Sequence, residues 1–582
     1  MNRLLTAISL FVALSFNAAA QLATTTSLVG TISDSSGKVI PSVKITAVET
    51  GTFDKYTAVT NGQGYYSIEF IRVGVYSITA EIAGFQKVTK TGVPVATNQV
   101  VRTDITLAVG AVTQSVTVEA TVLAIKTDDA SVSEIIGTRA IADLPLSGRD
   151  PMQLAVSTPG VLQGSKSSAT GVPPGEDFNG AGTREIQNSL SLDGISIMNN
   201  LITTTPTRPM VESIQEVEVQ TGTYSAQYGA YLGVHINMVT KSGTNQVHGA
   251  LVEFLRNQVL DARSFFTLPT PANPTAAKPP LRQNQFGYEI DGPVVIPKLY
   301  NGRNKTFFMS SYEGHRLVQQ VTSLSTQMPA AFFSGNFSAA PTSSITGGVI
   351  KDPLNGNAPF GGNMIPSTRL SQITAKLQQY YPASNLPGLS SNYSVPVPTT
   401  IGTDQTVDRI DQNIGDKIRL YVRAHYQNEN VFAGNAIPVN ASTIPVKTSN
   451  YTFGYTHTLT PNLVNDFRVG RHRLDTDNLN YFTVNGLKDA GSSLGVGGFT
   501  GDVRFNNPGI PEFNVTGFNG LGNSGSDWYQ ADSTYQLSDQ ISWNRGSHNI
   551  MAGLEFRRLA TAREATNSPR GSFSFNGTLS GY

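Results

Sequence analysis

The seven histidines of this chain are the residues best suited to metal binding or acid–base chemistry, so their spacing is a first test for an enzyme. They lie far apart along the sequence, at His235, His248, His315, His425, His457, His472 and His548. None lies in an HExxH motif, and none has a close partner at metal-ligand spacing. The histidines therefore predict no metal site and no catalytic residue, and we do not expect an enzyme.

Three other motifs match a chemical pattern only in part. Residues 520–525 spell GxGxxG, but they lack the preceding strand and following helix that let this motif bind a dinucleotide. Asp475 and Asp477 could touch calcium, but the rest of a twelve-residue ligand loop is missing. Asp193, in a Leu-Asp-Gly sequence, fits a turn better than a catalytic acid. No cofactor is predicted.

The segment from residue 114 to residue 120 could bind a partner without any chemistry. It alternates β-branched and polar residues: Gln114, Ser115, Val116, Thr117, Val118, Glu119 and Ala120. Such a segment can add as a strand to an exposed sheet edge of another protein, through main-chain hydrogen bonds. Two alternatives stay open from the residues alone, because the same pattern suits the last strand of a preceding sandwich or an inert linker.

Composition sets the broad class of the chain. Its 582 residues are enough for several domains, and only 14% are charged, against roughly 25% in soluble proteins. Lys+Arg and Asp+Glu both total 41, which gives no basic excess for neutralising phosphates, so nucleic acid is not an expected partner. The absence of cysteine excludes disulfides and thiolate metal sites.

The first twenty residues read as a cleaved signal peptide. Arg3 precedes the apolar run 4–16, and alanines at 18–20 supply a small-residue cleavage site. A retained anchor is the alternative, although this run is shorter than the roughly 20 residues that span a bilayer. No later segment resembles a transmembrane helix. If the mature chain enters a membrane, it must therefore do so as a closed barrel, because lipid cannot satisfy free backbone groups.

Residues 27–109 predict a small β-sandwich of short strands. The strand-like runs are 28–33, 42–49, 56–60, 65–70, 75–82 and 101–109. Turn signals such as Asn61-Gly62 separate them, and regular short strands with such turns are typical of a sandwich. Tyr65, Tyr66 and Phe85 fit core and turn packing better than an exposed platform for sugars.

Residues 126–243 predict a compact mixed domain. Short helices are expected at 139–144 and 150–156, a strand–turn–strand at 189–197 and a strand at 214–221. The stretch from Ser225 to Asn257 then contains an alternating strand, a turn at 241–245 and a new strand from Gln246, so it marks a junction between two kinds of structure.

From Gln246 onward, apolar and polar residues alternate in long runs. Candidate strands are 246–256, 283–295, 305–316, 407–415, 418–426, 449–458, 463–474, 535–545 and 549–557. A tilted membrane strand needs roughly 9–11 such residues, with an apolar face towards lipid and a polar face towards a wet lumen. The histidines would then be lumen-facing or interfacial side chains. Soluble sandwiches also alternate, but the number and length of these runs, with the signal peptide, favour a barrel.

The connections between these strands are long and polar, at roughly 258–280, 317–404, 427–447 and 475–533, with one helix candidate at 370–381. In outer-membrane barrels the long loops face outward. Aromatic residues near strand ends, namely Tyr455, Phe467, Trp543 and Phe556, could form interfacial girdles.

Several stretches resemble TonB-dependent outer-membrane receptors of the Oar-like branch. They are the junction 225–257, LDARSFF at 260–266, PPLRQNQFGYEIDGPV at 279–294, KTFFMSSYEGHR at 305–316 and IPSTRLSQITAKLQQYYPASN at 365–385. The front domain resembles the carboxypeptidase regulatory-like, transthyretin-type domain, a carbohydrate-binding-like fold that is fused in front of many such receptors.

The resemblance implies a mainly β protein with the following order. A signal peptide (1–20) precedes a regulatory-like sandwich (27–109), a linker with a TonB-box-like strand at Gln114–Ala120 (110–125), an α+β plug (126–243) and an incomplete antiparallel transmembrane barrel (244–582). The sequence supplies only nine or ten of the twenty-two strands expected of such a receptor, which predicts a fragment.

The resemblance also implies partners and a function. A TonB-type periplasmic energiser would pull on residues 114–120, displace the plug and import a large solute through the outer membrane. The solute could be an oligosaccharide, a peptide or a metal chelate, and outer-membrane lipid would surround the barrel. The alternative is a surface adhesion or carbohydrate-binding protein without transport.

Overall fold

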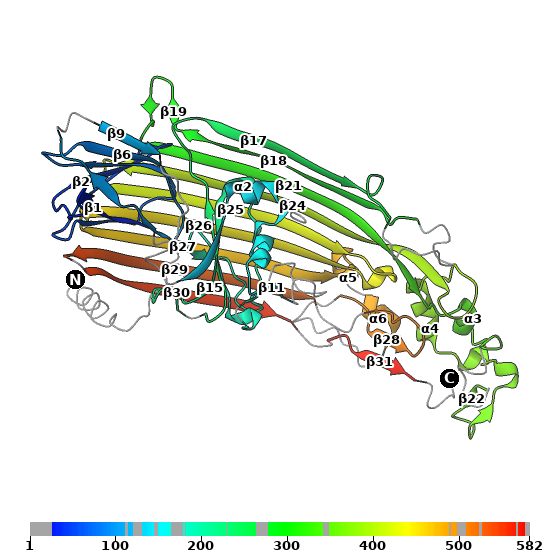
Figure 1. Cartoon of the computed structure of the whole chain (residues 1–582). Coiled ribbons are helices and arrows are strands. Elements are labelled where there is room, and N and C mark those ends of the chain that lie inside the picture. The colour runs from blue at the N-terminus through cyan, green and yellow to red at the C-terminus, as the bar shows by residue number, and fades with distance from the viewer. Residues whose placement is uncertain are drawn as a thin grey trace.

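The computed structural model describes residues 26–110, 115–119, 131–144, 149–164, 178–180, 182–229, 231–263, 277–340, 349–487, 490–496, 508–522, 527–546, 548–565 and 569–576. The expected signal peptide lies outside these residues. The architecture is mainly β, as predicted. Figure 1 shows three parts: a small sandwich, an inner domain, and a long curved sheet that passes both of them.

The sandwich consists of two sheets that enclose one apolar core. The first has the order β4–β1–β7, with β8 also paired to β1, and the second the order β3–β2–β5–β6–β9. The strands are β1 (Ser27–Asp34), β2 (Lys44–Glu49), β3 (Lys55–Val59), β4 (Tyr65–Glu69), β5 (Gly74–Glu81), β6 (Lys87–Val95), β7 (Val100–Arg102), β8 (Ile105–Leu107) and β9 (Ser115–Glu119). Leu28, Ile45 and Ile78 are fully buried in the core, and each contributes about 1.5–3 kcal/mol by leaving water.

Two predictions for the sandwich are corrected. The single strand expected at 101–109 is two short strands, because the chain leaves the sheet at Thr103 and Asp104, where the Asp104 carboxylate accepts a hydrogen bond from Thr31 N–H. Strand β6 was not predicted. Its lysines, Pro94 and Gly92, whose φ is +75°, hide the alternation, and the pairing with β5 shifts register nearby.

The inner domain, defined here as residues 131–240, has a five-stranded sheet of order β10–β15–β16–β13–β14. Its elements are β10 (Val132–Gly137), α2 (Thr138–Asp143), η2 (Pro151–Ser157), β11 (Val161–Gln163), β12 (Phe178–Gly180), η4 (Glu185–Gln187), β13 (Ser189–Leu192), β14 (Ile195–Ser196), η5 (Val211–Ser213), β15 (Ile214–Gly222) and β16 (His235–Thr240). The expected strands and the first helix are confirmed. The second helix is a 3₁₀ turn instead, capped by the Asp150 carboxylate, which accepts from Met152 N–H.

The long sheet contains nine antiparallel strands in the described part of the chain. Their order is β17 (His248–Asn257), β18 (Leu281–Pro293), β21 (Thr306–Ser325), β24 (Tyr393–Ile414), β25 (Ile418–Ala433), β26 (Ser442–Thr460), β27 (Leu463–Asn480), β29 (Trp528–Arg545) and β30 (His548–Glu564). Each of the nine predicted runs overlaps one of these strands, and the bounds at the sandwich end differ by at most two residues.

The two faces of the long sheet are opposite to those of a soluble protein. On β25, Arg423 and His425 are completely buried, while Val422 is 53% exposed. Its cross-strand neighbour Ile410 is 55% exposed as well. The polar face is covered by the inner domain and the sandwich, and the apolar face is uncovered, which is the alternation of a membrane strand. Tyr455, Phe467, Trp543 and Phe556 all lie on this outer face.

The connections differ between the two ends of the sheet. At the end next to the sandwich the hairpins are short, with residues 415–417 between β24 and β25 and 461–462 between β26 and β27. At the other end lie the long connections (Figure 1). These connections are shorter than expected, because β21, β24, β25, β26, β27 and β29 continue well past the apolar zone. These additional strand segments are rich in polar residues, so apolar–polar alternation did not predict them.

Small elements fold the long connections into clusters with apolar cores of their own. They are α3 (Ala330–Phe333), β22 (Lys351–Asp352), β23 (Ala358–Pro359), η8 (Gly361–Asn363), η9 (Ser367–Arg369), α4 (Gln372–Leu377), η10 (Gln378–Tyr380), η11 (Pro438–Asn440), α5 (Tyr481–Val484), α6 (Ala490–Leu494), β28 (Glu512–Val515) and, after β30, β31 (Ser572–Phe575). At the sandwich end, β19 (Val295–Ile296) and β20 (Tyr300–Asn301) pair with each other in the connection between β18 and β21. Elements α4 and η10 confirm the expected helix. Within the described residues, none of the helices has the length and apolar character needed to cross a membrane.

Glycine 470 allows the inner domain to approach the long sheet closely. A Cβ atom at this position of β27 would lie 2.6 Å from Ile195 Cγ1 of β14 and 2.8 Å from the carbonyl oxygen of Tyr451. We predict that Gly470→Ala lowers the free energy of unfolding by about 1–3 kcal/mol through overpacking. Denaturant unfolding in detergent, followed by tryptophan fluorescence, measures the change.

Gly402→Ala is the matched control, because a Cβ on Gly402 of β24 would have its nearest neighbour 4.0 Å away, at Arg316 Cδ. The control variant should keep the stability of the parent chain. Equal stability of the two variants would contradict a close contact between β14 and β27.

Candidate functional site

The predicted partner-binding segment, Gln114–Ala120, forms the edge of the sandwich. Its centre is β9, which pairs in parallel with β6, from Lys87 opposite Ser115 to Thr91 opposite Glu119. Val116, Thr117 and Val118 are all exposed. Gln114 and Ala120 lie outside the described residues. The placement matches the alternative of a last sandwich strand, and it also leaves β9 at the end of its sheet, where among the described strands only β6 pairs with it.

The second candidate site is the turn between β13 and β14, where Asp193 leaves the inner domain. Asp193 and Gly194 have φ values of +50° and +81°, as in the tight turns that reverse two-residue hairpins. Thr240 fixes the carboxylate from the end of β16: its N–H donates to Oδ1 and its hydroxyl to Oδ2, both at 2.9 Å. Asp193 is therefore a turn residue, as expected, and its buried carboxylate also points at the long sheet.

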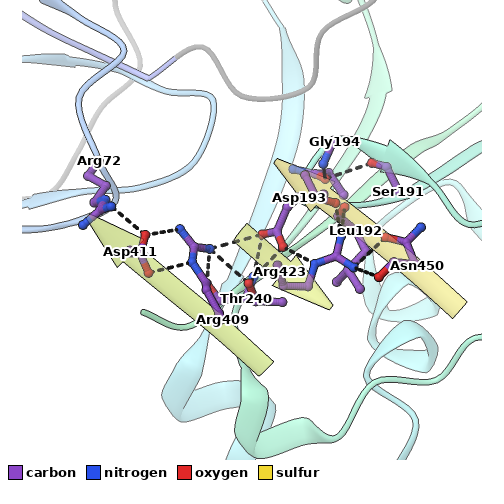
Figure 2. Close-up of polar contacts among 12 residues, drawn as sticks. Arg72, Ser191, Leu192, Asp193, Gly194, Thr240, Arg409, Asp411, Arg423 and Asn450 are labelled. Carbon is purple, nitrogen blue, oxygen red and sulfur yellow. Dashed lines mark hydrogen bonds and ion pairs between the residues drawn. The ribbon is translucent and has the colours of Figure 1, made fainter. Parts of the chain in front are cut away.

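Two arginines of the long sheet meet this carboxylate. Arg409 on β24 and Arg423 on β25 are direct cross-strand neighbours. Like charges at such positions destabilise a sheet, and here both are buried, so a counter-charge is needed. Asp193 supplies it: Arg423 Nε donates to Oδ2 at 2.9 Å, and Arg409 Nη1 lies 3.6 Å from Oδ1 (Figure 2).

Every nitrogen of the Arg423 guanidinium donates a hydrogen bond. Besides Asp193, its acceptors are the carbonyl oxygens of Leu192 and Asn450, the amide oxygen of Asn450 and the hydroxyl of Thr452, at 2.5–3.1 Å. A buried charge is tolerated only when it is paired and its donors are satisfied. Leu192 and Asp193 belong to the inner domain, so that domain supplies two of the acceptors that the buried guanidinium needs. The inner domain and the long sheet are thus electrostatically interdependent.

The charge chain continues to the sandwich. Arg409 donates from Nε and Nη2 to Asp411, two residues further on β24, and Arg72 of the sandwich donates from Nη2 to the same carboxylate at 2.6 Å. Figure 2 shows Arg72, Asp411, Arg409, Asp193 and Arg423 in succession, so that one chain of alternating charge joins all three parts. A cavity of about 200 Å³ lies beside it, between the three parts.

Further from the charges, side-chain amides attach the inner domain to the long sheet. Gln536 of β29 donates to the carbonyl oxygen of Gly194 and accepts from Ser196 N–H. Gln427 of β25 donates to the carbonyl oxygen of Pro206 and accepts from Arg208 N–H. The apolar core of the inner domain, in contrast, contains no side chain of the long sheet, so the interface between them is mainly polar.

The pKa of Asp193 reflects these contacts. Burial alone would raise the pKa of its carboxyl, but the guanidinium groups of Arg423 and Arg409 and the hydrogen bonds from Thr240 outweigh burial and hold the pKa below its usual value of 3.8. A carboxyl whose pKa falls on folding stabilises the folded state above its unfolded pKa. That contribution is lost as the pH falls through the lower, folded pKa.

The residues considered for chemistry at the outset are scattered. His235 packs against Tyr224, Tyr228 and Tyr231, and burial lowers its pKa to about 4, so the ring is neutral at pH 7. His425 and His472 are buried on the inner face of the long sheet, as expected for lumen-facing residues. Among the described residues, no group of three or more His, Asp or Glu side chains could hold a metal ion.

The two weaker motifs lie on β27 and in the segment that follows β28. The Asp475 carboxylate on β27 accepts hydrogen bonds from Arg473 of the same strand. Of the GxGxxG sequence, residues 520–522 form a loop with a β-bridge between Leu521 and Phe513, and residues 523–525 lie outside the described residues.

The sequence did not single out Arg409 or Arg423 as a pair. Both lie in predicted strands, 407–415 and 418–426, and the polar face predicted for such strands is the one on which Arg423 is buried. What was hidden was the register, because only the hairpin at 415–417 puts the two arginines opposite each other.

Comparison with known families agrees with this architecture. The model of the outer membrane beta barrel domain matches residues 239–582, more than half of the chain, so the chain belongs to that family. The carboxypeptidase regulatory-like domain matches residues 27–108.

The chain is also similar to a named transporter. It is 25% identical over 305 residues to the TonB-dependent transporter Oar of Myxococcus xanthus, which covers 48% of this chain and 26% of that protein. The chain thus spans about a quarter of the length of this curated relative.

Two solved structures show a weaker likeness. The outer membrane transporter YddB from Escherichia coli has a TM-score of 0.45 at 11% identity, covering 74% of this chain and 48% of that one. The siderophore receptor PirA from Acinetobacter baumannii has a TM-score of 0.42 at 12% identity, covering 75% and 49%. At these scores we draw no argument from them.

Removing the charge of Asp193 tests the site. We predict that Asp193→Asn lowers the free energy of unfolding at pH 7 by about 3–5 kcal/mol, because the buried guanidinium of Arg423 loses its counter-charge, whereas Arg409 keeps Asp411. The difference in free energy of unfolding between this variant and the parent chain should become smaller as the pH falls below about 3.9, the pKa of an Asp carboxyl in the unfolded chain. Denaturant unfolding at pH 7, 5 and 3 measures both effects.

The control is Asp408→Asn, which removes a carboxylate from the same region of β24. Asp408 is exposed and accepts only a side-chain hydrogen bond from Ser310 among the contacts described. This variant should unfold like the parent chain at each pH. A pH-independent loss in Asp193→Asn would show that its charge is not what matters.

Proposed function

We propose that this chain is part of a TonB-dependent outer-membrane transporter, in which the inner domain acts as the plug. The observation that carries the proposal is the interface just described: a folded domain covers the polar face of a membrane-type sheet and is joined to it through the Asp193 cluster and amide contacts. The similarity to Oar supports it.

A polar interface suits a plug that must leave and return. The apolar core of the inner domain contains no side chain of the long sheet. Displacement of the inner domain would therefore expose polar groups that water can solvate rather than apolar side chains. Hydrogen bonds exchanged for water cost only about 0.5–1.5 kcal/mol each. The buried Asp193 pair is more costly to break, and it would set the resting position of the plug.

The energiser would act on the segment Gln114–Ala120. Its centre is β9, an exposed edge strand at the sandwich end of the sheet, where the hairpins are short. Short turns mark the periplasmic side of outer-membrane barrels. A TonB-type protein in the periplasm would therefore reach β9 and could pair with it by strand addition. The signal peptide predicted at 1–20 would deliver the chain to this compartment.

The imported solute would first meet the long connections at the opposite end. Two of them, together with the segment that contains β31, enclose an apolar cavity of about 670 Å³. Its aromatic lining consists of Phe332, Phe333, Phe337, Tyr381, Phe513, Phe518, Phe573 and Phe575. This volume is in the range of small-molecule pockets, roughly 300–1,000 Å³. The solute itself remains one of the three classes expected from the sequence.

Deleting residues 114–120 tests the proposal. We predict that the purified chain is retained by an immobilised periplasmic domain of a TonB protein, and that the deletion abolishes retention. Thr117→Ala, which keeps the backbone of β9, should be retained like the parent chain. Retention of the deletion variant would remove the role assigned to this segment, and failure of the parent chain to bind would oppose the function itself.

A further inference from the structure

The sandwich covers the junction between the inner domain and the long sheet. On the inner-domain side, the backbone N–H of Thr97 donates to the Glu216 carboxylate at 2.8 Å. The amide of Asn98 donates to Glu218 at 2.9 Å and to the Tyr228 hydroxyl at 2.7 Å. Thr97, Asn98, Glu216 and Glu218 are buried and Tyr228 is half-buried, so the loop at 97–98 is a fitted contact of the sandwich with β15 and its surroundings.

On the sheet side, the sandwich binds several strands. Arg72 pairs with Asp411 of β24, whose carboxylate is completely buried. Arg419 of β25 lies 3.7 Å from the ring centre of Tyr56 and donates to the carbonyl oxygen of Lys55 at 2.8 Å. On β30, the last strand in the order of the sheet, Asn549 donates to Glu69 at 2.9 Å.

The sandwich also holds the hinge between the inner domain and the first sheet strand, residues 241–247. Asn245 donates from its backbone N–H to the carbonyl oxygen of Gly51 and from its side chain to that of Thr52, at 3.0 and 2.9 Å. A Cβ atom on Gly51 would lie 3.5 Å from Cβ of Thr244. The sandwich is thus in contact with every part that would separate if the inner domain moved.

Chain connectivity decides which part a pull on β9 reaches first. Seven residues, 108–114, connect β9 to β8, whereas twelve residues, 120–131, connect it to β10 of the inner domain. A fully extended chain spans at most about 3.3–3.6 Å per residue, so the connection to the sandwich reaches at most roughly 25 Å and the connection to the inner domain roughly 40 Å. Tension on β9 therefore loads the sandwich before the inner domain.

We propose that the sandwich is a latch over the junction of the inner domain and the long sheet, and that a periplasmic partner which pairs with β9 removes this latch before the inner domain moves. The inference rests on the transport function proposed above and adds an order of events to it. The partner is a protein with a free β-strand edge, because β9 offers main-chain groups and exposed valines rather than a charged patch.

Engineered cysteines can test the latch, since the chain has no cysteine of its own. Gly51→Cys with Thr244→Cys should form a disulfide, because the 3.5 Å between the two Cβ positions falls within the 3.5–4.5 Å that a disulfide requires. This bond would fix the sandwich to the hinge. Each single-cysteine variant is a control that cannot form it.

The reporter is Val239→Cys, at a half-buried position beside the cavity that the sandwich, inner domain and sheet enclose. Its reaction with a fluorescent maleimide is measured in cells that contain the TonB system, with and without a protonophore. We expect several-fold faster labelling in energised cells, loss of that acceleration when the 51–244 disulfide is present, and recovery after reduction.

Two outcomes would overturn the latch: acceleration that persists with the disulfide intact, and no acceleration although the chain is retained by the TonB domain. Because retention is measured separately, either outcome leaves the transport proposal standing, whereas loss of retention itself counts against that proposal.

A second variant tests the latch without energy. Arg72→Ala should accelerate labelling of Val239→Cys several-fold in protonophore-treated cells, because the sandwich loses its ion pair with Asp411. The matched control is Lys44→Ala, which breaks an exposed ion pair with Glu81 within the sandwich and should leave labelling unchanged. Equal labelling of the two variants would show that the Arg72 contact does not hold the sandwich in place.

Discussion

The structure depends on a pair of like charges placed opposite each other in a sheet. Arg409 and Arg423 are neighbours across β24 and β25, and both are buried. Two guanidinium groups in that position repel each other and cannot be left without partners. The long sheet therefore requires the carboxylate of Asp193 from the inner domain, which pairs with Arg423. The second carboxylate, Asp411 of β24, pairs both with Arg409 and with Arg72 of the sandwich. This chain of charges runs through all three parts and supplies a contact that involves each of them.

The three parts are joined by polar contacts and do not share one apolar core. The sandwich and the inner domain each have a closed apolar core, so neither needs the sheet in order to bury its hydrophobic residues. The contacts between parts are mainly charges, amides and backbone groups, which have geometric preferences that apolar contacts lack. An interface of this kind gives one resting arrangement without fusing the cores, which is what a displaceable plug requires.

Much of this fold could be predicted from the sequence, and the exceptions have physical reasons. Alternation found all nine strands of the long sheet, because lipid and lumen impose opposite polarity on successive residues. It failed where strands continue beyond the apolar zone, as in β24, where Thr399 to Gln405 include little apolar contrast. It failed again at β6, whose Gly92 and Pro94 look like turn residues. Apolar–polar alternation predicts a strand only where the two faces of that strand differ in polarity.

The candidate site was harder to predict, since it is made by register rather than by local sequence. Leu192-Asp193-Gly194 announced a turn, and the turn is there. Nothing near Asp193 in the sequence indicated that its carboxylate would be buried against two arginines more than 200 residues away. The segment 114–120 shows the opposite case: its strand character was readable, but not its pairing with β6, which depends on the edge that the sandwich leaves open.

A double-mutant cycle between Asp193 and Arg423 tests the central claim most directly. The stabilities of Asp193→Ala, Arg423→Ala and the double variant would be compared with that of the parent chain by denaturant unfolding at pH 7. If the buried charge pair joins the inner domain to the sheet, the coupling energy should be about 2–3 kcal/mol, at the upper end for contacting residues. Additive effects, with a coupling energy below about 0.5 kcal/mol, would contradict the account.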